Sequence, residues 1–235
     1  MIIHVANPIY DSVFKYIMED ERIAKTILSA LLKKELVHVT VRPHEYCNTT
    51  RDTLSMFRID FAATVREKEG NEIKDRIVLI ELQKTWLNTE TLRFRQYLGA
   101  QYNNKNNIRE ADEKGYAYPM VAVYLLGHKV GNIKEPIVYV NHDVFDYNGN
   151  VVAEGNAEPF VESLTHNSII VQIPRLQGNV NNRLEKVLSV FDQTNVEGDT
   201  QQVLKIDEDK YADDNDMMYV LHKLTAAAAN SEMRQ

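Results

Sequence analysis

The N-terminal part of the chain has apolar residues at helical spacing. Between residues 11 and 36 this spacing is interrupted once, near Glu19 and Asp20. The apolar positions are Val13, Phe14, Ile17, Ile23, Ile27, Leu28 and Leu31. Because apolar residues three and four positions apart lie on one side of a helix, the pattern predicts two consecutive helices.

Six later segments have the short apolar or alternating pattern of β-strands. They are VHVTV (37–41), MFRIDFAATV (56–65), DRIVLIELQK (75–84), YPMVAVYLL (118–126), IVYV (137–140) and SIIVQIP (168–174). Further helices are expected at about 88–106, 180–191 and 217–229, and the acidic stretch 207–216 predicts a solvated loop. Strands interspersed with helices predict an α/β fold, with a mixed β-sheet flanked by helices.

The strands at 56–65 and 75–84 are separated by a charged segment that contains Gly70 and Asn71, a turn signal. If these two residues form the turn of a hairpin, the numbers of opposed residues sum to 141, and Asp60 falls opposite Glu81. Directly opposed side chains share one face of a sheet, with Cβ atoms about 4.5–5.5 Å apart.

Both faces of this hairpin carry apolar residues. Alternation places Gln83 on the face of Glu81 and sends Lys84 to the other face, unless a bulge intervenes. The face of Glu81 also holds Asp60, Ala62, Thr64, Ile77 and Leu79, and the other face holds Ile59, Phe61, Val78, Ile80 and Leu82. Two covered faces are typical of strands in the middle of an α/β sheet.

Two carboxylates side by side on a buried surface repel each other. A divalent cation removes that repulsion, and Mg²⁺ is usually held by one or two carboxylates together with waters and phosphates. The pattern therefore indicates a metal site at Asp60 and Glu81. The alternative is that a longer loop shifts the register, and that each carboxylate pairs with an arginine such as Arg58 or Arg93.

Composition narrows the choice of partners. The 235-residue chain has a formal net charge of −7, which does not favour non-specific coating of nucleic acid but leaves room for a local basic groove or a metal. The single cysteine, Cys47, excludes an internal disulfide and a cysteine-based zinc site. The sequence shows neither a signal peptide nor a long apolar run, so we expect a cytoplasmic protein that does not enter the membrane.

Four segments, in order, carry a resemblance to a known family. They are NPIYDSVFKYIMED, the hairpin with RID and IELQK, TLRFRQYLGAQY and YAYPMVAVYLLG. The set resembles the PD-(D/E)xK nuclease superfamily, and within it the recombination-promoting nuclease and PD-(D/E)xK nuclease family transposase group. The first segment resembles the Asp-x-x-Phe-Lys signature of that group, here Asp11, Phe14 and Lys15, and Gln83 stands at the usual lysine position.

The resemblance covers roughly residues 7–127. It implies a restriction-endonuclease-like core in residues 1–130. Residues 131–235 would add C-terminal strands and helices as an extension packed on this core, so that the two parts form one structural unit.

For the site, the resemblance implies that Asp60 and Glu81 bind Mg²⁺ or Mn²⁺, and that Gln83 orients the attacking water or a phosphate oxygen. Gln83 cannot carry the positive charge of lysine, which puts catalytic strength in doubt. Asp11 matches the helix-borne acidic residue of the superfamily, with a helix cap or a solvated charge as the alternative.

Three further residues are candidates for binding the substrate. Arg93 and Tyr97 lie four apart on one face of the expected helix, where Arg93 could contact phosphate and Tyr97 a base or the outer shell of the metal. The alternatives are a salt bridge for Arg93 and a core aromatic for Tyr97. Lys84 would serve only if a bulge turns it inward.

Together these features predict a metal-dependent DNA endonuclease of the recombination or mobile-element type, a Mg²⁺-dependent deoxyribonuclease with DNA as its partner. The alternative is a catalytically weak or inactive nuclease-fold protein that acts as a nucleic-acid-binding or protein-interaction module. A homodimer is compatible with both.

Overall fold

A computed structural model of the chain describes residues 1–42, 45–50, 53–58, 61–69, 72–83, 90–108, 115–153, 155, 158–198 and 201–230. Within them the fold is mixed α/β, with a six-stranded mixed sheet flanked by helices, as the sequence predicted at this level. Among these residues, no helix combines the length and the apolar character that crossing a membrane requires.

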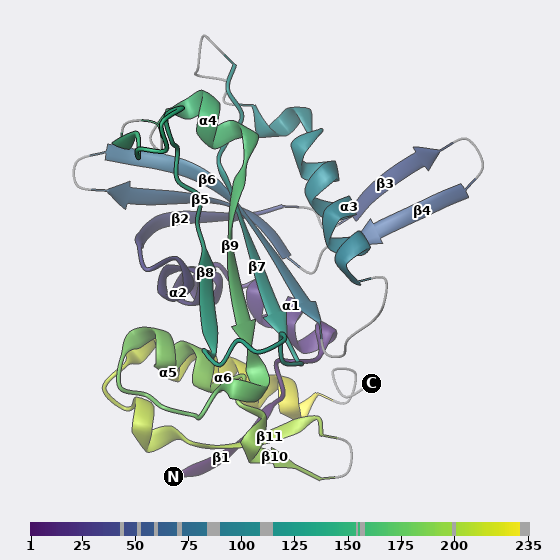
Figure 1. The fold of residues 1–235 in the computed structure, drawn as a ribbon. Coiled ribbons are helices and arrows are strands. Elements are labelled where there is room, and N and C mark those ends of the chain that lie inside the picture. The colour runs from purple at the N-terminus through teal and green to yellow at the C-terminus, as the bar shows by residue number, and fades with distance from the viewer. Residues whose placement is uncertain are drawn as a thin grey trace.

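The central sheet has the strand order β2-β5-β6-β7-β9-β8 (Figure 1). The strands are β2 (Glu35–Val41), β5 (Phe61–Glu69), β6 (Glu72–Gln83), β7 (Met120–Leu126), β9 (His166–Gln172) and β8 (Ile137–Val140). The first three are antiparallel neighbours, β6, β7 and β9 run parallel, and β8 closes the edge in the antiparallel sense. This order places β6 in the interior of the sheet, between β5 and β7.

The predicted register of the β5–β6 hairpin is confirmed. All nine opposed pairs, from Phe61–Ile80 to Glu69–Glu72, have numbers that sum to 141. Only two residues separate the last opposed pair, Glu69 and Glu72, and so short a connection leaves no slack for a slip. A one-residue slip would also exchange the two apolar faces.

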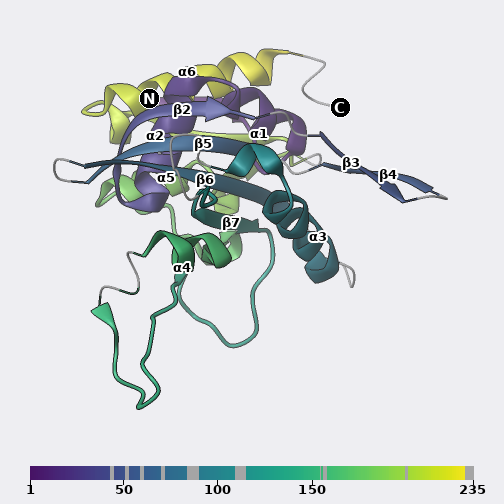
Figure 2. The same cartoon turned by 90° about the horizontal axis from the view of Figure 1, so that it is seen from above.

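Helices cover both faces of the sheet (Figure 2). The face with Phe61 and Ile80 packs against α1 (Asp11–Met18), α2 (Glu21–Leu32), α5 (Arg183–Ser189) and α6 (Asn215–Ala229), and these buried side chains form the first core. The face with Ala62 and Leu79 packs against α3 (Glu90–Tyr102), and these buried side chains form the smaller second core. The interruption between the first two helices is a cap, because the side chain of Asp20 accepts hydrogen bonds from the backbone N–H groups of Arg22 and Ile23.

The first strand of the chain pairs with strands from residues 196–207 in a second, small sheet that the sequence pattern did not predict. Its order is β1-β11-β10, formed by β1 (Ile2–Ala6), β11 (Val203–Asp207) and β10 (Val196–Glu197). Because β8 and β9 also belong to the central sheet, that sheet includes strands from both sides of the division expected at residue 130.

The strand expected at 56–65 is two strands, which corrects the prediction. Residues 56–58 belong to β4 (Thr53–Arg58), which pairs with β3 (Glu45–Thr50) in a separate hairpin, and β5 begins at Phe61. Figure 1 shows this hairpin projecting beyond α3. Apolar residues occur both in β4, which pairs with β3, and in β5, which pairs with β6. The hydrophobic pattern therefore does not mark the boundary between the two strands.

The expected loop at 207–216 contains a turn of 3₁₀-helix instead. Tyr211 in this turn is buried, and Asp214 caps α6 by accepting from the N–H of Met217. The remaining short elements are α4 (Pro159–Leu164), η1 (Lys105–Asn107), η3 (Ile173–Arg175), η4 (Gln193–Asn195) and η5 (Glu208–Tyr211).

Candidate functional site at the end of strand β6

Glu81 lies near the C-terminal end of β6, on the face that packs against α3. Its side chain is only 6 % exposed, because β6 is an interior strand surrounded by apolar residues. A buried carboxylate costs several kcal/mol unless a charged or hydrogen-bonding partner compensates it. The position of Glu81 therefore requires a partner on this face.

Arg93 from the first half of α3 supplies such a partner. Its Nη2 atom donates a hydrogen bond to Oε1 of Glu81 over 2.6 Å, a short distance typical of charge-assisted bonds. The Arg93 side chain is 32 % exposed, so this ion pair reaches from the interior to the surface. The alternative that the sequence left open combined a shifted hairpin register with an arginine partner for each carboxylate. The described residues show the arginine partner of Glu81 but not the shifted register.

The rest of α3 closes this face with apolar groups. Tyr97, one turn after Arg93, is buried and packs in the second core with Leu98 and Phe94. The cavity between these side chains and Glu81 has a volume of about 10 Å³, which leaves room for no more than a water molecule. In this arrangement Tyr97 is a core aromatic, as in the second of the two interpretations given above.

Tyr124 is a neighbour of Glu81 that sequence reasoning missed. It is the residue of β7 in register with Glu81, and its ring centre lies 4.9 Å from that of Phe94. Burial, followed by the negative charges of Glu81 and of ionised Tyr102, raises the pKa of Tyr124 to about 12. The phenol therefore stays protonated at neutral pH. No local pattern marks Tyr124, because its proximity depends on which strand pairs with β6.

The other predicted residues of the metal site fall outside what the structure describes. Asp60 and Lys84 are not among the described residues, and of Gln83 only the backbone is described, in register with Leu126. No group of three or more His, Cys, Asp or Glu side chains that could hold a metal occurs within the described part of the chain. The carboxylate of Glu81 is a ligand type that suits Mg²⁺, but the described residues include only this one of the two expected ligands.

Asp11 is the first residue of α1, and its exposed side chain pairs with Lys15 at 2.8 Å. Its neighbour Phe14 is fully buried in the first core. The ion pair and the core contact together account for the three residues of the Asp-x-x-Phe-Lys pattern within one helix. Helix α1 packs on the sheet face opposite to Glu81. A catalytic role for Asp11 therefore finds no support in this position and stays a prediction.

Comparison of the chain with protein-family models, curated proteins and solved structures found no match in any of the three.

Proposed function

We propose that this chain is a metal-dependent DNA endonuclease with a restriction-endonuclease-like core. The observation that carries the proposal is the buried carboxylate of Glu81 at the end of a hairpin in which the numbers of opposed residues sum to 141. If this register continues by one pair beyond Phe61–Ile80, Asp60 would stand opposite Glu81. The order of elements supports the proposal, because the hairpin is followed by α3 and by a parallel strand, β7.

Each residue then has a defined role. Asp60 and Glu81 would hold Mg²⁺ or Mn²⁺, and the bound metal would polarise the phosphate and lower the pKa of the attacking water. Gln83 would orient that water. Arg93 neutralises Glu81 in the protein alone, and a DNA phosphate would offer its guanidinium a second anionic partner.

The test is cleavage of DNA with Mg²⁺ or Mn²⁺ present. We expect weak cleavage by the wild type and a loss of about 10²-fold or more in Glu81→Gln and in Asp60→Asn, because each removes a positioned charge. Asp75→Asn is the matched control. Asp75 is also an arginine-paired carboxylate on β6, bound to Arg66 at 2.8 Å, but it lies at the far end of the strand. Equal cleavage by Glu81→Gln and by the wild type contradicts the proposal.

The ion pair between Glu81 and Arg93 favours a second function, that of a nuclease-fold module that binds nucleic acid or protein without cutting. In this case the arginine is the permanent partner of Glu81. The two functions separate in one experiment, in which DNA binding and DNA cleavage are measured on the same samples. Binding that is independent of metal, together with no cleavage at any metal concentration, supports the second function.

A further inference from the structure

A second buried carboxylate, Glu67 on β5, lies on the opposite face of the sheet from Glu81. Its side chain is 1 % exposed and is held by two cations. Nζ of Lys34 lies 3.1 Å from Oε2, and Nε of Arg76 lies 3.0 Å from Oε1. Arg76 is five residues before Glu81 on β6, roughly 16 Å along the strand. The cluster is therefore separate from the proposed nuclease site and does not depend on it.

Glu67 orients Arg76 and leaves part of its guanidinium available. The bond to Glu67 uses Nε, and within the described residues the two Nη groups have no hydrogen-bond partner. The Arg76 side chain is 13 % exposed and lines two adjacent cavities. An oriented guanidinium with two parallel N–H groups matches the geometry of a carboxylate or phosphate.

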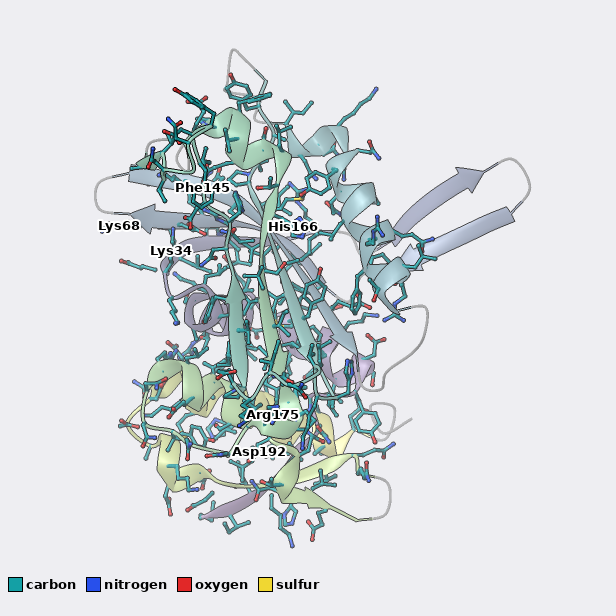
Figure 3. The ribbon with its side chains drawn as sticks, in the orientation of Figure 1. Lys34, Lys68, Phe145, His166, Arg175 and Asp192 are labelled. Carbon is teal, nitrogen blue, oxygen red and sulfur yellow. The ribbon has the colours of Figure 1, made fainter. Side chains whose placement is uncertain are left out.

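The larger cavity is a groove of about 440 Å³ between the end of α2 and the sheet. Figure 3 shows Lys34 at this edge of the sheet, beside Lys68. Lys33 and Lys34 form the turn that ends α2, and Nζ of Lys33 lies 4.2 Å from the centre of the Tyr139 ring, another lining residue. Three cations and one carboxylate line the groove, an excess of two positive charges on a chain of net charge −7.

The backbone at Lys33 is unusual for a lysine. Its φ is +54°, in the left-handed region that glycine normally occupies at a helix end. This conformation costs about 1 kcal/mol or more for a residue with a side chain. A lysine at this position thus places a charged side chain at the groove where the backbone alone would favour glycine.

Asn167 supplies a polar group of the opposite kind. This residue lines the groove, and its side-chain oxygen is buried without a hydrogen-bond partner in the described part of the chain. An orphaned acceptor of this kind costs about 1–3 kcal/mol. The groove therefore combines unused donors on Arg76 with an unused acceptor on Asn167.

We propose that this groove binds a small oxyanion that also carries a hydrogen-bond donor, such as a hydrogen phosphate group or a hydroxy-carboxylate. Arg76 binds the anionic oxygens in a bidentate manner, with Glu67 as the positioning residue that holds its guanidinium. Lys33 adds positive charge at the rim, and the side-chain oxygen of Asn167 accepts from the ligand. The carboxylates Asp143 and Glu162 line the smaller adjacent cavity instead, so the positive charge is concentrated in the groove.

The experiment is calorimetric titration of the full chain with inorganic phosphate and, separately, with glycolate, at constant ionic strength. We expect saturable one-to-one binding of at least one of the two. Binding of phosphate alone identifies a phosphate site, and binding of glycolate alone identifies a carboxylate site. Arg76→Lys keeps the positive charge but loses the pair of parallel N–H groups of the guanidinium, so we expect binding to weaken roughly tenfold or more.

Two variants make the result decisive. Lys33→Ala changes an exposed lysine that has no bond to Glu67, so this variant should fold even if Arg76→Lys does not. We expect Lys33→Ala to weaken binding several-fold. Lys68→Ala removes an exposed lysine of the same region that does not line the groove, and we expect unchanged affinity. Absence of saturable binding of either probe overturns the proposal. Equal affinity in wild type, Lys33→Ala and Lys68→Ala overturns it as well.

Discussion

At the scale of single residues, two buried carboxylates lie in the described part of the β5–β6 hairpin, each bound to an arginine and each on a different face. Glu67 is paired with Arg76 and Lys34, and Glu81 is paired with Arg93. Removal of one partner from a buried ion pair is costly because the other charge stays behind without compensation. The cost therefore depends on which partner is more deeply buried.

For the pair at the candidate site, we expect Arg93→Ala to destabilise the protein more than Glu81→Gln does. Arg93→Ala leaves a buried carboxylate, at a cost of about 1–3 kcal/mol, whereas Glu81→Gln leaves an arginine that is one-third exposed. Urea unfolding in the presence of a metal chelator measures both changes. Arg95→Ala, at an exposed position of the same helix, should have almost no effect. If Glu81→Gln is the more destabilising change, Glu81 has a structural role that the ion pair does not explain.

Burial, and then the charge of His142, lowers the pKa of His166 below its ordinary value of 6.5. The unfolded chain therefore binds a proton at a higher pH than the folded chain does. We expect stability to be fully present above pH 6.5 and to fall as the pH drops from there towards the lowered pKa.

The His166→Gln variant should show a smaller loss of stability across this pH range, measured by urea unfolding at several pH values. Part of the loss should remain, because burial also lowers the pKa of His128. His222→Gln, at an exposed position on α6, is the control. An unchanged pH profile in His166→Gln would count against this assignment.

At the scale of elements, α2 depends on its first capping residue. Asp20 caps α2 and also accepts a hydrogen bond from the hydroxyl of Tyr219 on α6, at 2.8 Å. We expect Asp20→Ala to cost about 1–2 kcal/mol in the free energy of unfolding, and Asp20→Asn to cost less because asparagine also caps helices well.

Glu19→Ala, one residue earlier and exposed, tests whether the effect belongs to the cap. It should leave the unfolding midpoint close to that of the wild type. Equal losses in Glu19→Ala and Asp20→Ala would show that general surface charge, and not capping, stabilises this end of α2.

The sequence predicted those elements whose signal is local. Helical spacing gave α1 and α2, the turn signal in the sequence at Gly70 and Asn71 gave the hairpin register, and Arg93 was one of the partners considered for Glu81. Strands β1 and β11 were missed because their pairing joins distant parts of the chain, and no local pattern records it. The cluster around Glu67 was missed although the same register could have indicated that Glu67 and Arg76 share a face.

At the scale of the whole molecule, the part after residue 130 is needed to cover strand β7 and the apolar core beside it. Its strand β9 pairs with β7 along seven residues and contributes Ile169 and Val171 to the first core. Without β9, the edge of β7 and this apolar surface would be exposed to water. We therefore expect a chain that ends after residue 130 to show no cooperative unfolding transition by circular dichroism. A soluble, cooperatively folded fragment would contradict this expectation.

The central proposal is that Asp60 and Glu81 together bind a divalent metal for DNA hydrolysis. Calorimetric titration with Mn²⁺ in the absence of DNA measures this pair directly. We expect one saturable site in the wild type, strongly weakened in both Asp60→Asn and Glu81→Gln and retained in Asp75→Asn. Absence of Mn²⁺ binding by the wild type, or binding that neither Asp60→Asn nor Glu81→Gln changes, would contradict the proposal and leave Glu81 as the partner of Arg93 alone.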